Sequence, residues 1–199
     1  MKLVLVDSGG ANLGSVRYAL ERLGVQAAVS GDPAVIGAAD RVILPGVGAA
    51  GPGMARLREL GLVEVLRGLR QPLLGICLGM QLLFEASDEQ DETCLGLLPG
   101  RVRRLAGGPG LRVPHMGWNR LEPLRESVLM HGIPAGAQAY FVHGYGAAVD
   151  GHCVARCVHG QPVAAVVQRG NVAGAQFHPE RSGPVGARLL ANFLEFGVA

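Results

Sequence analysis

The chain has 199 residues, of which 49% are hydrophobic and 17% charged, so it is sized for one compact domain spanning residues 1–199. Its formal net charge of +2 is too small to favour binding of nucleic acid or of an anionic membrane surface. No apolar run approaches the roughly 20 residues of a membrane-spanning helix, and the opening MKLVLVDSGG is too short for a signal peptide's hydrophobic region. We therefore expect a cytoplasmic protein with no nucleic-acid or membrane partner.

Short apolar runs alternate with helix-like segments through the first half of the chain. Residues 2–7 (KLVLVD) predict a strand buried on both faces, and residues 13–23 carry apolar side chains at helical spacing. Between them, Gly9-Gly10-x-x-x-Gly14 lacks the spacing and the lysine of a phosphate loop and predicts a turn. Further strands are expected at VQAAVS, RVILPG and PLLGIC. Helices are expected at 56–69, with a break near Gly61, and in LGMQLLFEASDE.

After Glu92 the pattern changes to strand-like segments with few helices between them: RVRRL, AYFVHGY, a cysteine-containing hairpin and NVAGAQFH. The last segment, GPVGARLLANFLEF, repeats apolar residues every four positions and predicts an amphipathic helix. The expected fold is therefore of the α/β class, with an open, mostly parallel sheet flanked by helices and an added antiparallel strand region.

Two of the four cysteines lie close together in HCVARCVH, where Cys153 and Cys157 are flanked by histidines. A metal cluster is one interpretation of this segment. The other is a hairpin, because GHCVARCVHGQPVAAVVQRG predicts two strands joined by a turn at 159–162, with Cys153, Ala155 and Cys157 on one face. The paired-ligand spacing of structural zinc sites is absent, so we favour the hairpin and expect no metal.

Cys77 lies in an apolar run with a glycine two residues away on each side, in GICLG (75–79). A strand is expected to end here and a helix to begin, as in the Gly-x-Ser-x-Gly turn of serine hydrolases. The glycines leave room for a sharp turn, and the helix N-terminus favours a thiolate. The N–H of Leu78 would then be placed to donate to an oxyanion. The alternative is that Cys77 is a small core residue.

A cysteine nucleophile needs a base, and the base needs an orienting group. Of the six histidines, only His178 is closely followed by a carboxylate, in AQFHPERS. Pro179 biases His178 towards an extended conformation, so His178 and Glu180 are expected to point to the same side. Glu180 can then accept an imidazole N–H. His178 could instead simply end a strand, but beside the Cys77 turn we favour a Cys–His–Glu triad.

These motifs carry a family resemblance. GICLGMQ (75–81) with FHPE (177–180) resembles the class I, triad-type glutamine amidotransferases. PGVG (45–48), VPHMGWN (113–119) and YFVHGY (140–145) resemble the glutaminase subunits of imidazole glycerol phosphate synthase. The resemblance spans essentially the whole chain. The sequence departs from that pattern at Ser8, Gly144 and Arg181, which are outside the triad.

The resemblance implies a flavodoxin-like fold and hydrolysis of glutamine through a cysteinyl thioester, without a cofactor. It also implies that the ammonia passes to a (β/α)₈ cyclase subunit in a heterodimer that makes imidazole glycerol phosphate. The alternatives are a glutaminase that serves a different synthase and a non-catalytic regulatory protein on the same fold.

The resemblance further implies roles for individual residues. The catalytic residues would be Cys77, His178 and Glu180. The oxyanion would be bound by Leu78 N–H and by a backbone N–H of Gly46 and Val47, where the freedom of Gly46 would let the donor peptide rotate. The expected glutamine-binding residues are Gln81, Glu89, His143, Gly144 and Tyr145. For Glu89, in ASDEQDE, a solvated loop is the alternative. The expected partner-interface residues are Asn12, His115, Met116 and Trp118.

Overall fold

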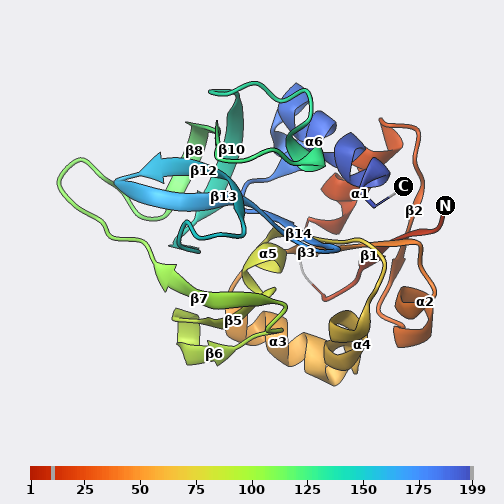
Figure 1. Ribbon diagram of the computed structural model, residues 1–199. Helices are drawn as coiled ribbons and strands as arrows, with labels where there is room; N and C mark the ends of the chain where they lie inside the picture. Colours follow the sequence, from red (N-terminus) through yellow and green to blue (C-terminus); the bar gives the residue numbers. More distant parts are fainter. Residues whose placement is uncertain (10–11, 198–199) are drawn as a thin grey trace.

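The computed structural model describes residues 1–9 and 12–197, so Gly10 of the expected first turn lies outside the described residues. Figure 1 shows a central sheet with helices on both faces and smaller strand layers at one end. Within the described residues the central sheet has the strand order β2-β1-β3-β4-β14-β13-β12-β9. No helix in the described part of the chain is long and apolar enough to cross a membrane.

The central sheet is parallel in its first part and antiparallel in its second. The parallel strands are β1 (Leu3–Val6), β2 (Ala27–Ser30), β3 (Arg41–Gly46), β4 (Leu73–Cys77) and β14 (Val172–Ala175). The antiparallel strands are β13 (Gln161–Arg169), β12 (Cys153–His159) and β9 (Glu122–Pro123). The parallel part has the flavodoxin-like strand order. The prediction of a mostly parallel sheet with an added antiparallel region is confirmed.

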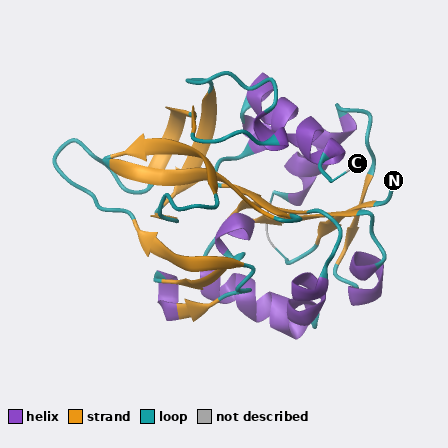
Figure 2. Cartoon of the chain, in the orientation of Figure 1, coloured by secondary structure: helices purple, strands orange, loops and turns teal. Residues whose placement is uncertain are grey.

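Helices cover both faces of the sheet, as Figure 2 shows. One face carries α1 (Leu13–Glu21) and α6 (Gly183–Glu195). The other carries α2 (Pro33–Gly37), α3 (Ala50–Glu59) and α4 (Leu62–Gly68). Because successive strand side chains point to opposite faces, Leu3 and Leu5 of β1 join the first apolar cluster, whereas Val4 and Val6 join the second.

Two smaller sheets lie beside the central one. In the first, β8 (His115–Arg120) pairs antiparallel with β10 (Gln138–His143). The second has the order β11-β7-β5-β6, with β11 (Tyr145–Gly146), β7 (Leu98–Arg104), β5 (Phe84–Ser87) and β6 (Glu92–Thr93). Single turns of 3₁₀ helix occur at η1 (Glu89–Asp91), η2 (Val128–Met130) and η3 (Pro179–Arg181).

Two of the expected helices differ in extent. The prediction of one helix through LGMQLLFEASDE is wrong, because α5 covers only Leu78–Gln81 and Phe84–Ser87 form β5. The strand prevails because β6 and β7, later in the chain, pair with its backbone and bury Phe84. The helix expected at 56–69 begins earlier, at Ala50. The predicted break near Gly61 is confirmed, because Gly61, with a positive φ of 66°, caps α4.

The cysteine-containing hairpin forms as predicted, with His159 opposite Gln161 around Gly160. The prediction that Cys153, Ala155 and Cys157 share one face is wrong, because the register shifts on both sides of Ala155. Ala155 and Cys157 belong to the first apolar cluster, whereas Cys153 belongs to the second. The four cysteines are free and buried. Residues 1–9 and 12–197 contain no group of three or more potential ligands that could hold a metal ion.

Candidate active site

The carboxyl ends of β3, β4 and β14 meet at one edge of the central sheet, where open α/β sheets bind ligands. Cys77 ends β4 and immediately precedes α5, with a positive φ of 54° that is uncommon for a residue other than glycine. Its side chain lines a cavity of about 270 Å³ together with His178. The nucleophile turn predicted for residues 75–79 is therefore strained in the way that is typical of functional residues.

The two glycines of this turn are required by close packing of backbone. A Cβ at Gly79 would lie 1.8 Å from the carbonyl oxygen of Leu44, and a Cβ at Gly75 would lie 2.6 Å from the carbonyl oxygen of Gly79. Both distances are far below a van der Waals contact, so any side chain here would displace the strand-to-helix turn. The Gly-x-Cys-x-Gly pattern thus has a physical reason at both positions.

His178 and Glu180 form the expected pair, in which His178 Nδ1 lies 2.8 Å from Glu180 Oε1. The Nδ2 atom of Asn12 donates to the same oxygen at 2.8 Å. The side chain of Glu180 has no exposed surface, and its Oε2 atom has no hydrogen-bond partner within the described residues. Because Nδ1 faces the carboxylate, the other ring nitrogen, Nε2, is left for proton transfer.

The proton balance of this pair suits a thiolate nucleophile. Burial by itself would lower the pKa of His178, but hydrogen bonds to Cys77 and Glu180 outweigh it and raise that pKa to about 10. Burial would likewise raise the pKa of Glu180, but His178 and Asn12 hold it below its usual range. The site therefore favours an imidazolium beside the thiol and an ionised carboxylate behind it.

The oxyanion segment differs in detail from the expectation. Gly46 is the last residue of β3 and lies opposite Cys77 in the sheet register. A Cβ on Gly46 would be 2.9 Å from the backbone nitrogen of Gly79, so this glycine is needed for packing against the nucleophile turn. Gly48, two residues further on, has a positive φ of 97° and open space around it, whereas Gly46 does not have a positive φ. Val47, Gly48 and Leu78 line the cavity.

All five expected glutamine-binding residues line the same cavity: Gln81, Glu89, His143, Gly144 and Tyr145. Gln81 Nε2 donates to the backbone oxygen of Tyr145 at 2.8 Å and to Gln176 Oε1 at 3.0 Å, which leaves Gln81 Oε1 as an acceptor. Glu89 is not simply a solvated carboxylate, because its Oε2 accepts the backbone N–H of Ala50 at the start of α3.

The four expected interface residues occupy three different environments. Met116 and Trp118 are 64% and 55% exposed and point outward from β8. His115 alternates with them along the strand and is buried, so its side chain does not reach that surface. Asn12 is half-buried and directed at Glu180.

Sequence reasoning missed Gln176 at the site and two contacts beside the expected interface residue Trp118. Gln176 is fully buried, and its Nε2 lies 3.9 Å from Cys77 Sγ. A polar residue inside the apolar stretch VAGAQF was the one available signal for it. Tyr140 packs edge-on against Trp118 at 5.8 Å between ring centroids, and Arg181 lies over the Tyr140 ring. No local pattern indicated these contacts, because they join β10 to β8 and to η3, which are far apart in the sequence.

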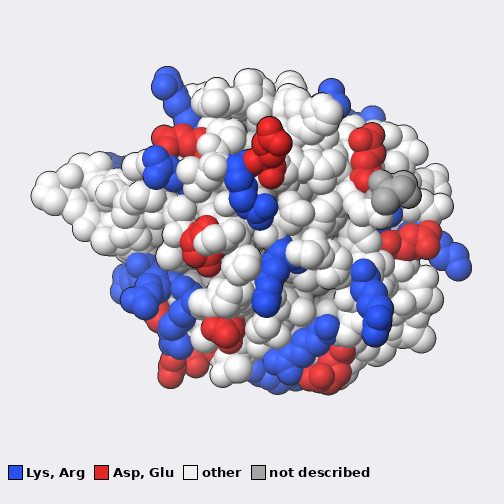
Figure 3. All heavy atoms as spheres, viewed as in Figure 1, with Lys and Arg blue, Asp and Glu red and all other residues white. Residues whose placement is uncertain are grey.

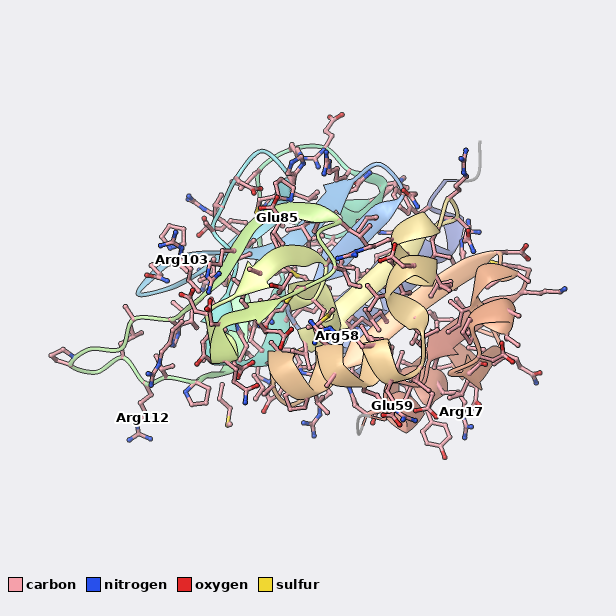
Figure 4. The ribbon with its side chains drawn as sticks, turned by 90° about the horizontal axis from the view of Figure 1, so that it is seen from below. Arg17, Arg58, Glu59, Glu85, Arg103 and Arg112 are labelled. Atoms are coloured by element: carbon pink, nitrogen blue, oxygen red, sulfur yellow. The ribbon has the colours of Figure 1, made fainter. Side chains whose placement is uncertain are left out.

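The charged residues do not mark a second binding surface on the face seen in Figure 3, where acidic and basic side chains are interspersed. In Figure 4, Arg112 projects from the loop between β7 and β8 away from the body of the molecule. Arg101 pairs with Asp88 and Asp91, so part of the positive charge is locally compensated.

Comparison with known proteins agrees with this geometry. The family model "Glutamine amidotransferase class-I" matches residues 4–196. The chain is 64% identical over 193 residues to "Imidazole glycerol phosphate synthase subunit HisH" of Xanthomonas euvesicatoria pv. vesicatoria, covering 97% of this chain and 96% of that protein. It is 60% identical over 198 residues to the protein of the same name from Xylella fastidiosa, covering 100% and 99%.

A solved structure described as a glutamine amidotransferase superposes with a TM-score of 0.77 at 24% identity, covering 98% of this chain and 99% of that one. At this identity the structural likeness shows the fold alone. The family model and the full-length relatives show more, because they match the sequence from β1 to α6. The chain therefore belongs to the class I glutamine amidotransferase family.

Proposed function

We propose that this protein is the glutaminase subunit of imidazole glycerol phosphate synthase in histidine biosynthesis, acting as a cytoplasmic heterodimer with a cyclase subunit. The observation that carries the proposal is the position of Cys77, which is held at a positive φ in one cavity with the His178–Glu180 pair. Support for the pathway comes from the relatives with 60% and 64% identity, which are named as subunits of that synthase.

The reaction follows from the chemistry of the cavity. Cys77 thiolate attacks the side-chain amide carbon of glutamine, and the resulting oxyanion accepts N–H donors from Leu78 and from the segment after β3. The C–N bond then breaks as His178 gives its proton to the departing nitrogen, which leaves as ammonia. His178 next removes a proton from water, which attacks the glutamyl thioester. Glutamate leaves and the thiolate is restored, while Glu180 holds the imidazole in place.

The cavity also has acceptors suited to the α-ammonium group of glutamine. Glu89 carries a carboxylate, and Gln81 presents Oε1 because both hydrogens of its amide are already donated within the protein. Both residues line the cavity together with Gly144 and Tyr145. A cavity of about 270 Å³ suits a single amino acid rather than a peptide.

We assign the synthase chemistry to a second chain, because the described residues form an open sheet and not a (β/α)₈ barrel. We propose β8 as the docking face, since Met116 and Trp118 are exposed there and the preceding Pro114 lines the cavity. Large exposed apolar and aromatic side chains of this kind are enriched at protein interfaces.

The test is a glutaminase assay on this chain alone and mixed with a cyclase subunit and its nucleotide ligand. We expect glutamate release to depend strongly on the partner, and the two chains to co-purify. Release that is equally fast without the cyclase, or co-purification with a different synthase subunit, would contradict the assignment of the partner. A pair that assembles but never releases glutamate would instead support a regulatory protein on the same fold.

A further inference from the structure

Two buried histidines that the proposed mechanism does not use form a hydrogen-bonded pair behind the glutamine cavity. His115 and His143 lie opposite each other on β8 and β10, which run side by side in Figure 1. His115 Nδ1 is 3.1 Å from His143 Nε2. His143 Nδ1 is 2.7 Å from the backbone oxygen of Tyr145, and Asn119 Nδ2 is 3.2 Å from His115 Nε2. These contacts make one continuous hydrogen-bond chain, Asn119–His115–His143–Tyr145.

Backbone groups at both ends fix the direction of this chain. A carbonyl oxygen only accepts, so His143 must carry its proton on Nδ1 and, when neutral, accept at Nε2. His115 Nδ1 then donates to His143, and His115 Nε2 accepts from Asn119. The amide of Asn119 cannot reverse without loss, because its Oδ1 accepts the N–H of Arg120 at 2.7 Å and its Nδ2 also donates to the oxygen of Val158 at 2.9 Å.

The hydrogen-bond chain therefore holds the imidazole rings of His115 and His143 in the neutral Nδ1–H form. A second proton on either ring would bring two N–H donors face to face at one of the contacts. The rings are 4% and 5% exposed, so water cannot compensate for such a clash. In agreement with this geometry, burial and repulsion from neighbouring imidazoles lower the pKa of His115 and of His143 to about 4.

The last acceptor of the hydrogen-bond chain, the Tyr145 backbone oxygen, belongs to a residue that lines the cavity. The oxygen of Tyr145 accepts from His143 and also from Gln81 Nε2, at 2.8 Å. Gln81, His143 and Tyr145 all line the cavity. Since both nitrogens of His143 are engaged within the protein, its ring contributes to the cavity by holding the Tyr145 peptide and not by binding glutamine through a nitrogen.

We propose that Asn119 and His115 are positioning residues for glutamine binding: through His143 they hold the Tyr145 carbonyl, and with it the amide of Gln81, in the orientation that receives glutamine. This inference rests on the proposed function, since it takes glutamine as the ligand of the cavity. Neither residue touches the cavity itself, and their effect is on the affinity for glutamine and not on the chemical step.

The stacking around His115 allows a matched pair of variants. The His115 ring lies between Phe141 and His159, with centroid distances of 4.9 and 4.1 Å and interplanar angles of 19° on both sides. His115→Phe keeps an aromatic ring in the stack but removes both nitrogens, so the chain is broken. His159→Phe is the matched control, because it also replaces a stacked imidazole by a phenyl ring. The hydrogen bond of His159, to the backbone oxygen of Arg112, does not belong to the series from Asn119 to Tyr145.

The kinetic test measures glutamate release by the pair with the cyclase subunit, with unfolding curves as a control for stability. For His115→Phe we expect KM for glutamine to rise about tenfold while kcat stays within about threefold, since His143 loses the buried hydrogen bond that orients its ring in the ground state. His159→Phe should keep KM within about twofold. Equal changes in the two variants, or a fall in kcat at constant KM, overturn the inference.

The second readout is the ¹⁵N spectrum of the imidazole rings in the wild-type complex, assigned with the His115→Phe variant. We expect His115 and His143 as neutral Nδ1–H tautomers that do not titrate between about pH 8 and about pH 6. An Nε2–H tautomer or an imidazolium at His143 overturns the inference. A wild-type pair that releases no glutamate overturns the proposed function instead, so the two failures are distinguishable.

Discussion

Replacement of Glu180 by glutamine removes one charge from a side chain that has no exposed surface. Glu180 Oε1 accepts two hydrogen bonds of 2.8 Å, from His178 Nδ1 and Asn12 Nδ2, and Oε2 has no partner within the described residues. If the new Oε1 keeps both bonds, the amide NH₂ takes the place of Oε2 and is buried without an acceptor. Such a group costs about 1–3 kcal/mol, so the free energy of unfolding should fall by about that amount.

The same change weakens the hydrogen bond from the His178 imidazolium to residue 180. A hydrogen bond to a charged group contributes about 1.5–3 kcal/mol and a neutral one about 0.5–1.5 kcal/mol, so about 1–2 kcal/mol is lost. The raised pKa of His178 should then decrease, because Glu180 is one of the groups that raise it. We expect kcat/KM for glutamine to fall about five- to thirtyfold. This loss is smaller than for Cys77→Ser or His178→Ala, because the carboxylate orients the imidazole and transfers no proton.

The assay is glutamate release by the pair with the cyclase subunit, measured for the three variants in parallel with urea unfolding. Glu180→Asn serves as a control, since its shorter amide cannot reach His178 from the same backbone position. The reasoning is refuted if Glu180→Gln is the most damaging of the three while its unfolding curve is unchanged. A variant with wild-type kcat/KM would equally remove Glu180 from the triad.

Four further predictions concern the thiol, two glycines of the oxyanion segment and the buried histidines. Cys77→Ser should abolish glutamine-dependent synthesis in the complex but leave synthesis from ammonium salts intact, and equal loss with both nitrogen sources would contradict the division of labour. Gly48→Ala should reduce the ratio of partner-stimulated to basal glutamate release, because an alanine in the positive-φ conformation of Gly48 costs about 1–2 kcal/mol. An unchanged ratio with normal assembly of the two subunits would exclude Gly48 as the residue whose backbone controls the stimulation. Alanine at Gly46, by contrast, should destabilise the nucleophile turn, because its Cβ meets the backbone of α5. The pKa of His115 and of His143 is lowered from 6.5 to about 4, so the unfolded chain binds protons first as the pH falls. The stability that these neutral histidines contribute should therefore be fully present above about pH 6.5, and the free energy of unfolding should decrease towards about pH 4 by about 1.4 kcal/mol per pH unit for each ring. Urea unfolding of wild type and of His115→Phe across this pH range should give plots of unfolding free energy against pH with different slopes. Parallel plots would disprove the prediction.

The sequence by itself determined the features that depend on neighbours along the chain. The nucleophile turn could be predicted because its backbone leaves no room for side chains at Gly75 and Gly79, which lie two residues before and after Cys77. The His178–Glu180 pair was readable because Pro179 restricts the backbone between them. The parallel sheet was readable from apolar runs with two buried faces, such as Leu3–Val6. In each case the physical cause lies within a few residues.

The tertiary structure alone decided the features whose partners lie far apart in the chain. β5 forms in place of a helix because β6 and β7 pair with it, although its own residues read as helical. Asn12 bonds to Glu180 across 168 positions, and Asn119, His115 and His143 join into one chain only because β8 and β10 pair in register. Hydrogen bonds of this kind depend on how separate elements pack, and local propensity carries no information about which of them will meet.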